Sequence, residues 1–292
     1  MTKIKYINCF GTSFTAGGGF EFETEYKPRA EILKTLYGNI NETLTQYNFS
    51  YPGQIKKLLP NIEVNNYGKN GYGNDRVFRL AHDIISDSNF KKDEHIFLFE
   101  FGGLGRKEYW YNELNDFIIL NYYIDWENNK LRDILYLANS WWYDSEELKS
   151  KLEREASLFL EFYKKTFSFE TEIKNYYREL DFFISFVESK KINYFLLTTL
   201  DETHSDKNFI YGDGTLFKKH NDFIRFSNIN NLEIDKETLN QYIDKHNGFV
   251  SNKIVAQTIY NSLIDLGFLN YEKINIDYKG LKNLKLSQRT II

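Results

Sequence analysis

Residues 3–19, KIKYINCFGTSFTAGGG, join an apolar run to a turn of small residues, and the predicted fold follows from them. The run at 3–10 has the length and nearly continuous apolar character of a strand that is covered on both faces of a sheet. Ser13 comes directly after it, between Gly11 and the glycines at 17–19. The stretch predicts a buried strand followed by a tight turn. It leaves two interpretations of Ser13: an exposed nucleophile or the cap of the next helix.

Three later segments have the same apolar character as the first strand: IEVNNYG (62–68), HIFLFEF (95–101) and INYFLLTTL (192–200). Between and after them, apolar residues recur three or four apart, which predicts amphipathic helices over 74–85, 173–191 and 249–267. Asn74 or Asp75 is the expected N-cap of the first of these helices, and Gly267 is the expected C-cap of the last. Strands that alternate with helices predict βαβ units, and therefore an α/β fold with a mostly parallel sheet.

The composition excludes several classes of protein. Cys9 is the one cysteine of 292 residues, so no internal disulfide can form. Because Cys9 ends a predicted buried strand, we expect an inert, small hydrophobic side chain there. The formal net charge of −4 gives no sign of a nucleic-acid surface. The sequence shows neither a signal-peptide pattern nor an apolar run of about 18 residues, so we expect a cytoplasmic or virion-associated protein without a membrane partner.

Two regions do not fit a minimal α/β unit. Residues 17–49 combine a glycine-rich start with a helical pattern in which Pro28 suits the first turn. Residues 109–170 are rich in tryptophan and tyrosine and are expected to be helical. Both follow the carboxyl end of a strand, the edge where open α/β sheets bind ligands. They are candidates for walls or lids of a site, or else for helices that pack on the sheet or on another subunit. The rest forms one predicted domain over 1–270, with a tail at 271–292.

A second loop, NNYGKNGYGNDR (65–76), also comes directly after a predicted strand. Gly71 and Gly73 permit unusual backbone angles there, and an N–H group at Gly71 could point into a cleft. Asn74 adds a side-chain donor beside it. The alternative interpretation is a glycine-rich loop that leads into an Asn/Asp helix cap.

One histidine stands where a catalytic base would be expected. His246 lies immediately before the predicted helix at 249–267, and Asp244 lies two residues upstream. A histidine at a loop–helix junction with a carboxylate nearby suits a general base and the group that orients it. The alternative is a structural or solvated histidine. The remaining histidines lack this setting: His82, His95, His204 and His220.

Taken in order, these stretches resemble the conserved blocks of the SGNH (GDSL-type) hydrolase family. CFGTSFTAG is similar to the first block, with Thr12 where Asp is more common, and VNNYGKNGYGNDRVFR resembles the second block of phage and bacterial members. FLFEFGGLGRKE falls at the third block, where Arg106 and Glu108 match an R-x-E pattern and are candidate site-supporting residues. DKHNGFVSNKIVAQTIYNSL resembles the last block. The resemblance covers roughly 1–15, 50–108 and 171–265.

The resemblance implies a three-layer α/β/α sandwich with about five parallel strands in flavodoxin-like order. It also implies an ester hydrolase with a catalytic triad, acting on small-molecule or glycan esters without a metal or organic cofactor. In this family pattern Ser13 is the nucleophile, His246 the base and Asp244 the group that orients it. The N–H groups of Ser13 and Gly71 are the donors of the implied oxyanion hole.

The chain departs from the family pattern at the third block. The Asn that usually donates to the oxyanion has no match, and Gly102 or Gly103 stands near its place. Either Asn74 replaces it as a donor of the oxyanion hole, or the hole has two donors. Asn247 follows the histidine where Pro is usual.

Three hypotheses of function follow. The first is a serine esterase that acts on an acylated sugar, because aromatic side chains of 109–170 could stack on sugar rings. The second is a catalytically silent relative, a structural or binding subunit of a phage particle or other assembly, or a homo-oligomer, that associates through 109–170 or the tail. The third is a flavodoxin-like phosphate binder with an anion nest at 17–19 or 71–74, which leaves Asp244 and His246 unexplained.

Overall fold

The computed structural model describes the following residues: 4–17, 47, 50–101, 106–125, 130–137, 145–198, 209–211 and 249–275. The chain divides into two compact units that interleave along the sequence. The first unit consists of residues 1–70, 93–100 and 193–292, and the second consists of residues 71–92 and 101–192. The assignment of residues 1–270 to one domain stays a prediction.

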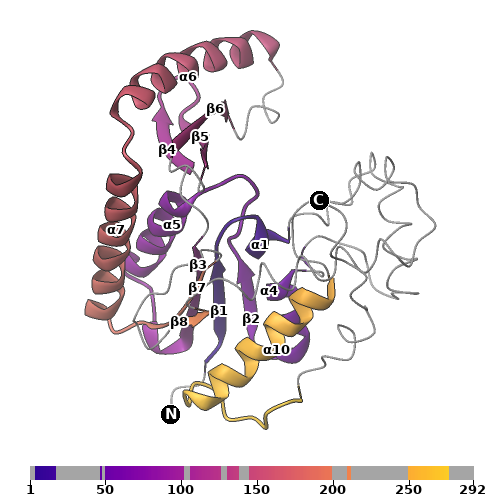
Figure 1. The fold of residues 1–292 in the computed structure, drawn as a ribbon. Coiled ribbons are helices and arrows are strands. Elements are labelled where there is room, and N and C mark those ends of the chain that lie inside the picture. Colours follow the sequence, from indigo (N-terminus) through magenta and orange to yellow (C-terminus); the bar gives the residue numbers. More distant parts are fainter. Residues whose placement is uncertain are drawn as a thin grey trace, which may run out of the picture. The chain divides into compact units, whose positions relative to one another are not determined.

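The first unit contains a mostly parallel sheet in the order β2-β1-β3-β7-β8 (Figure 1). β1 pairs in parallel with both β2 and β3, so that Ile7 lies opposite Val64 and Ile96, and β7 pairs in parallel with β8. Numbered along the chain, this is the 2-1-3-4-5 order of flavodoxin-like sheets. The predicted α/β class and strand order are therefore confirmed. The strands are β1 (Tyr6–Phe10), β2 (Glu63–Asn66), β3 (His95–Phe101), β7 (Asn193–Thr198) and β8 (Phe209–Tyr211).

One face of this sheet packs on two helices, α4 (Tyr51–Leu58) and α10 (Phe249–Asp265), which lie side by side in Figure 1. α4 begins at Ser50, whose hydroxyl accepts a hydrogen bond from the Gly53 N–H group. Alternate strand residues face these helices, and Cys9 is among them. Burial raises the pKa of the Cys9 thiol, as expected for an inert side chain. The fully buried members of this core include Ile7, Cys9, Tyr51, Ile55, Ile96, Leu98, Phe195, Leu197, Val255, Ile259 and Leu263.

The other face of β1 and β3 is aromatic at one end and polar at the other. The Phe10 ring packs against Phe97 and Phe99, with centroids 5.7 and 5.4 Å away. Toward the start of the strands, Asn65 Nδ2 donates to Asn8 Oδ1 over 3.1 Å, and Asn8 Nδ2 lies 3.0 Å from His95 Nδ1. Side-chain amides thus join β2, β1 and β3 across the strands.

The second unit contains the helices α5 (Asn74–Ser86), α6 (Glu146–Thr166) and α7 (Phe169–Ser189). The short 3₁₀ helix η2 (Lys92–Glu94) spans a point in the sequence where the chain passes from one unit to the other. In α5 the stripe of Val77, Ala81 and Ile85 is buried, as the periodicity predicts. α6 and α7 begin after serine N-caps, Ser145 and Ser168, whose hydroxyls accept hydrogen bonds from backbone N–H groups three residues later. The predicted helices at 74–85, 173–191 and 249–267 are confirmed as α5, α7 and α10.

The expectation that 109–170 is helical is wrong for its first part. Three antiparallel strands form a second sheet there, in the order β4-β5-β6, and the helix α6 follows it. The β-branched and aromatic residues of DFIILNYYID favour a strand over a helix. Asn115 closes the turn between β4 and β5 with a positive φ of 50°, which asparagine tolerates well. The strands are β4 (Arg106–Tyr111), β5 (Asp116–Asp125) and β6 (Lys130–Leu137).

The predicted insertion at 17–49 and the predicted tail lie largely outside the described residues. Gly17 and Tyr47 are described in the former, and the helix expected after Pro28 is not. At the start of the tail, the Asn261 side chain of α10 bonds both the carbonyl and the N–H group of Ile274, over 2.9 and 3.0 Å. Within the described ranges we find no helix with the length and apolar content that crossing a membrane requires.

Candidate active site

Ser13 lies where the topology of the sheet favours a ligand site. It is the first residue of the short helix α1 (Ser13–Ala16), directly after the carboxyl end of β1. β1 has β2 on one side and β3 on the other, and these neighbours follow it in sequence, so the strand order changes direction at β1. In open α/β sheets, ligands bind outside the carboxyl ends of the strands at such a switch point. Ser13 is itself buried, with 4% of its surface exposed.

A fully buried carboxyl group, Glu100 of β3, holds the turn that carries Ser13. Glu100 Oε2 accepts hydrogen bonds from the Thr12 N–H group over 2.7 Å and from Thr15 Oγ1 over 2.9 Å. Thr12 Oγ1 donates to Glu100 Oε1 over 3.0 Å. A Cβ atom at Gly11 would lie 2.3 Å from Glu100 Oε2, so the carboxyl approaches the strand end where only glycine leaves room. The turn and the carboxyl group therefore form one packed, hydrogen-bonded unit.

This arrangement bears on whether Ser13 caps the helix. The Ala16 N–H group donates to the Thr12 carbonyl, so Thr12 precedes the helix and Ser13 is its first helical residue. In the first turn of the helix, the Thr15 side chain donates to Glu100 over 2.9 Å. The N-cap position therefore belongs to Thr12, and Ser13 is not the cap.

Burial dominates the electrostatics of Glu100. Desolvation raises the pKa of its carboxyl, and the hydrogen bonds from Thr12 and Thr15 act in the opposite direction. Thr15 Oγ1 also lies 3.0 Å from the Tyr51 hydroxyl, which is fully buried in α4. Polar groups of β3, α1 and α4 are thus hydrogen-bonded to one another at the turn that carries Ser13.

The second predicted loop leads into α5 in the second unit. Gly71 has a φ of 79°, a left-handed conformation that favours glycine, as the sequence suggested. Gly73 instead has an extended backbone, with φ −109°, and it is the N-cap residue of α5. The expected capping by Asn74 or Asp75 is wrong, because Asn74 is the first helical residue and no side chain caps the helix. A Cβ atom at Gly73 would lie 2.6 Å from the Arg106 carbonyl oxygen, so close approach to β4 explains the glycine.

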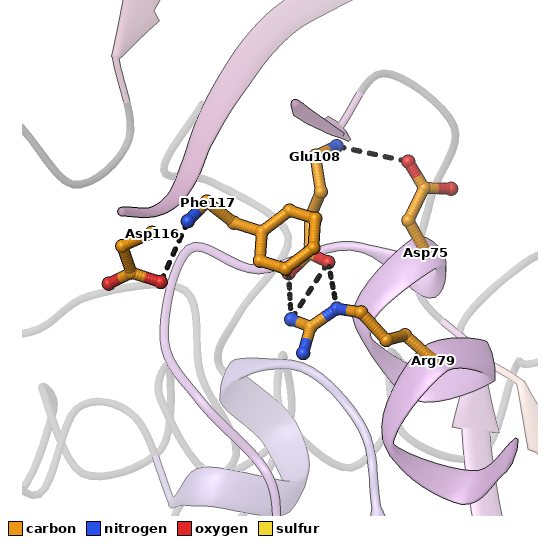
Figure 2. Close-up of polar contacts among 5 residues, drawn as sticks. All are labelled: Asp75, Arg79, Glu108, Asp116 and Phe117. Carbon is orange, nitrogen blue, oxygen red and sulfur yellow. Dashed lines mark hydrogen bonds and ion pairs between the residues drawn. The ribbon is translucent and has the colours of Figure 1, made fainter. Parts of the chain in front are cut away.

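The candidate supporting residues Arg106 and Glu108 lie together on β4 beside this loop. Arg106 Nη1 donates to the Tyr72 carbonyl over 3.2 Å. The Glu108 N–H group donates to Asp75 Oδ2 over 3.0 Å, and this bond occupies the carboxylate that had been expected to cap α5. The Glu108 carboxylate binds Arg79 of α5 through both Nε and Nη2 (Figure 2). β4 therefore contacts the start of α5 through side chains and backbone.

Several predicted site residues are not brought together by the structure. His246 and Asp244, and likewise Gly102 and Gly103, lie outside the described residues. Ser13 belongs to the first unit, whereas Gly71 and Asn74 belong to the second. The triad and the shared oxyanion hole stay predictions. Among the described residues, no cluster of His, Cys, Asp and Glu side chains is suited to hold a metal ion.

Sequence reasoning missed Glu100 and Arg79. The signal for Glu100 was present, since one carboxyl group in the otherwise apolar strand HIFLFEF must find hydrogen-bond donors when the strand is buried. Arg79 ends the NDRVFR stretch, one helical turn after Asp75, and spacing of this kind places both side chains on one face of α5. Their partners, Thr12, Thr15 and Glu108, are distant in sequence, so the pairings themselves could not be read from it.

Comparison with known proteins adds little to this geometry. No family model matches the chain, and no match was found among curated proteins. Among solved structures, the chain is similar to a protein from Desulfitobacterium hafniense DCB-2 that is assigned provisionally to the G-D-S-L family of lipolytic proteins. The two chains are 12% identical, the match covers 88% of this chain and 98% of the other, and the TM-score is 0.30. A TM-score this low does not support a family assignment. The family resemblance therefore rests on the sequence blocks.

Proposed function

We propose that the protein is a serine ester hydrolase in which Ser13 is the nucleophile. The observation that carries the proposal is the position of Ser13 at the switch point of the sheet, on a turn that Glu100 holds through hydrogen bonds from Thr12 and Thr15. Ser13 is the first helical residue, so its hydroxyl does not occupy the N-cap position of α1. The sequence blocks add His246 as the base and Asp244 as the group that orients it.

The proposed reaction proceeds through an acyl-enzyme. Ser13 Oγ attacks the ester carbonyl carbon while His246 accepts the hydroxyl proton, and the carbonyl oxygen becomes an oxyanion. The N–H groups of Ser13 and Gly71 and the side chain of Asn74 donate hydrogen bonds to that oxyanion. His246 then returns the proton to the departing alcohol, and the ester C–O bond breaks. A water molecule, activated by His246, releases the acid and restores Ser13.

We extend the proposal to esters of carbohydrates. Aromatic side chains gather on β4, and Trp110 exposes about half of its surface. Its ring packs edge to face on Phe117 of β5, with centroids 5.2 Å apart, and this contact stabilises the orientation of the indole. A supported, exposed indole ring suits stacking against the apolar face of a sugar. The β4-β5-β6 sheet would then contribute to substrate recognition.

Turnover of p-nitrophenyl acetate and labelling by a fluorophosphonate probe test the proposal. We expect the wild-type protein to hydrolyse the ester, and Ser13→Ala and His246→Ala to lower kcat by at least about 10³-fold. Ser157→Ala, which changes an exposed serine of α6, is the matched control. Labelling should map to the peptide that contains Ser13. Turnover that survives Ser13→Ala would refute the assignment of the nucleophile.

A silent binding protein is the second candidate, and one observation favours it. Leu158 and Phe162 of α6 and Phe182 of α7 each expose more than half of their surface. Leu158 and Phe162 are four residues apart and therefore lie on one face of α6. Light scattering separates the candidates, because a monomer with esterase turnover would exclude a purely structural role. An inactive oligomer that Leu158→Glu with Phe162→Glu converts to a monomer would support it.

A further inference from the structure

We infer that Glu100 is a positioning residue for Ser13, acting through Thr12 and Thr15, which lie before and after it in sequence. This inference rests on the proposed esterase function. Glu100 would not touch the substrate. Its carboxyl would instead fix the conformation of the turn between β1 and α1, and with it the direction of the Ser13 hydroxyl and N–H group.

The contacts surround Ser13 on both sides in sequence. Thr12 precedes it and donates to Glu100 through its N–H group and its hydroxyl, over 2.7 and 3.0 Å. Thr15 follows two residues later and donates through its hydroxyl over 2.9 Å. A chain held at Thr12 and Thr15 leaves little freedom to Ser13 and Phe14 between them. The Ser13 backbone is therefore fixed by groups other than its own side chain.

A hydrogen-bonded path extends the same support to α4. Thr15 Oγ1 donates its proton to Glu100, so the Tyr51 hydroxyl is the donor in the 3.0 Å contact between the two hydroxyls. Tyr51 is fully buried in the core that α4 and α10 form on the sheet. The turn is thereby joined to β3 and to α4, two elements that are anchored in the core.

The chemistry of position 100 argues against a role in packing alone. Ile96 and Leu98 precede Glu100 at two-residue intervals on β3, so all three side chains point to the same face. The first two belong to the apolar core. An apolar side chain at position 100 would continue that core without the desolvation cost of a buried carboxyl. The carboxyl oxygens of Glu100 accept hydrogen bonds from the turn that carries Ser13. An apolar residue could not position the turn in this way.

Three variants separate positioning from stability. Glu100→Leu removes the acceptors, and we expect kcat to fall by about 10²-fold with KM nearly unchanged, because a small displacement of a nucleophile has that effect. Glu100→Gln keeps one acceptor oxygen and should restore kcat to within about tenfold of wild type. Leu98→Ala is the matched control, since it creates a cavity in the same strand and leaves the turn intact. It should lower stability without lowering kcat per folded molecule.

Two further measurements keep the test decisive. Hydrogen exchange of the Thr12 amide, which needs no substrate, should accelerate in Glu100→Leu and not in Leu98→Ala. If Glu100→Leu does not fold, Thr15→Val removes one donor with little change of shape, and kcat should fall by about tenfold.

The outcomes distinguish this inference from the proposed function. Loss of kcat in Glu100→Leu with faster Thr12 exchange supports positioning. Equal losses of kcat in Glu100→Leu and Leu98→Ala, or unchanged Thr12 exchange, overturn positioning and leave the esterase intact. A wild-type protein without turnover or probe labelling overturns the esterase and the catalytic role of Glu100 together. In that case Thr12 exchange reports whether the carboxyl still fixes the turn.

Discussion

Arg79 and Glu108 form a bidentate ion pair between α5 and β4, with Arg79 Nε and Nη2 lying 3.1 and 3.0 Å from the same carboxylate oxygen (Figure 2). The Glu108 side chain is 3% exposed and the Arg79 side chain is 31% exposed. The guanidinium carbon also lies 4.0 Å from the centroid of the Phe117 ring. Burial raises the pKa of Glu108, and Arg79 opposes that shift. The pair therefore stabilises a carboxylate that would otherwise be buried without compensation.

Arg79→Met should lower the free energy of unfolding by about 2–3 kcal/mol. The substitution keeps much of the side-chain volume and leaves the Glu108 carboxylate without its cationic partner. Urea unfolding measures the change. Arg178→Met, on the exposed face of α7, is the matched control and should change the free energy by less than about 0.5 kcal/mol. Equal effects of the two substitutions would show that the Glu108 pair contributes little.

Gly73→Ala should destabilise the second unit through a steric clash. The new methyl carbon would lie 2.6 Å from the Arg106 carbonyl oxygen, and neither backbone can yield easily. We expect a loss of about 1–3 kcal/mol, typical of overpacking. Gly267→Ala is a useful comparison, because its φ of +74° is strained for alanine while no atom lies within 4 Å. In that variant the loss should come from the backbone alone, about 1–2 kcal/mol.

His95 should make the protein less stable as the pH falls below about 6.5. Asn8 Oδ1 accepts from Asn65, so Asn8 Nδ2 donates to His95 Nδ1, which must be unprotonated. Burial lowers the pKa of His95 from its ordinary value of 6.5. Between that value and the lowered one, the unfolded chain binds a proton that the folded protein does not, and unfolding is favoured. Urea unfolding from pH 7.5 to 5 should show the decline.

His95→Gln should flatten this pH dependence, because the side chain no longer titrates. His82→Gln, at an exposed position of α5, is the matched control for the replacement of a histidine by glutamine. A slope that His95→Gln does not alter would assign the pH dependence to other groups.

The stability difference between wild type and Glu100→Gln should depend on pH. Burial raises the pKa of Glu100 above its ordinary value of 4.5. As the pH rises from about 4.5 through the raised pKa, the unfolded chain releases its proton first, so the wild type loses stability relative to Glu100→Gln. Thermal unfolding of the two proteins across this range measures the difference. A difference that stays constant would mean that the Glu100 pKa is the same folded and unfolded.

The parallel sheet could be predicted from the sequence because its strands are buried on both faces. Segments such as HIFLFEF are almost continuously apolar, and helical periodicity separates them. The strand order was implied by the family resemblance, and the pairing of β1 with both β2 and β3 confirms it.

The second sheet could not be predicted by the same reasoning. Large aromatic residues in 109–137 occur in exposed helices as well as in half-buried strands, and the alternation in β4 is weak. The decisive interactions are between strands, such as Lys107 opposite Leu120, and the packing of Leu120 on α6. Cross-strand pairs of this kind depend on residues that are not neighbours in sequence.

The candidate site was predicted in part. Ser13 was identified from its place after a strand, which the structure reproduces. The buried partners of its turn were not identified, because Glu100 reaches Thr12 and Thr15 only after β1 and β3 have paired. The sequence therefore indicates a candidate nucleophile more readily than the groups that hold its turn.

The two sheets also imply an order of folding events. β4 and β5 pair through a four-residue turn, with Tyr111 opposite Asp116, and hairpins of this kind form in about 1–10 μs. β1 instead pairs with β3, and Tyr6 lies opposite His95. Proteins rich in contacts so distant in sequence fold orders of magnitude more slowly than proteins rich in local contacts. The Ser13 turn acquires its Glu100 bonds only at that later stage. During synthesis, the proposed catalytic residue is made early and is fixed late.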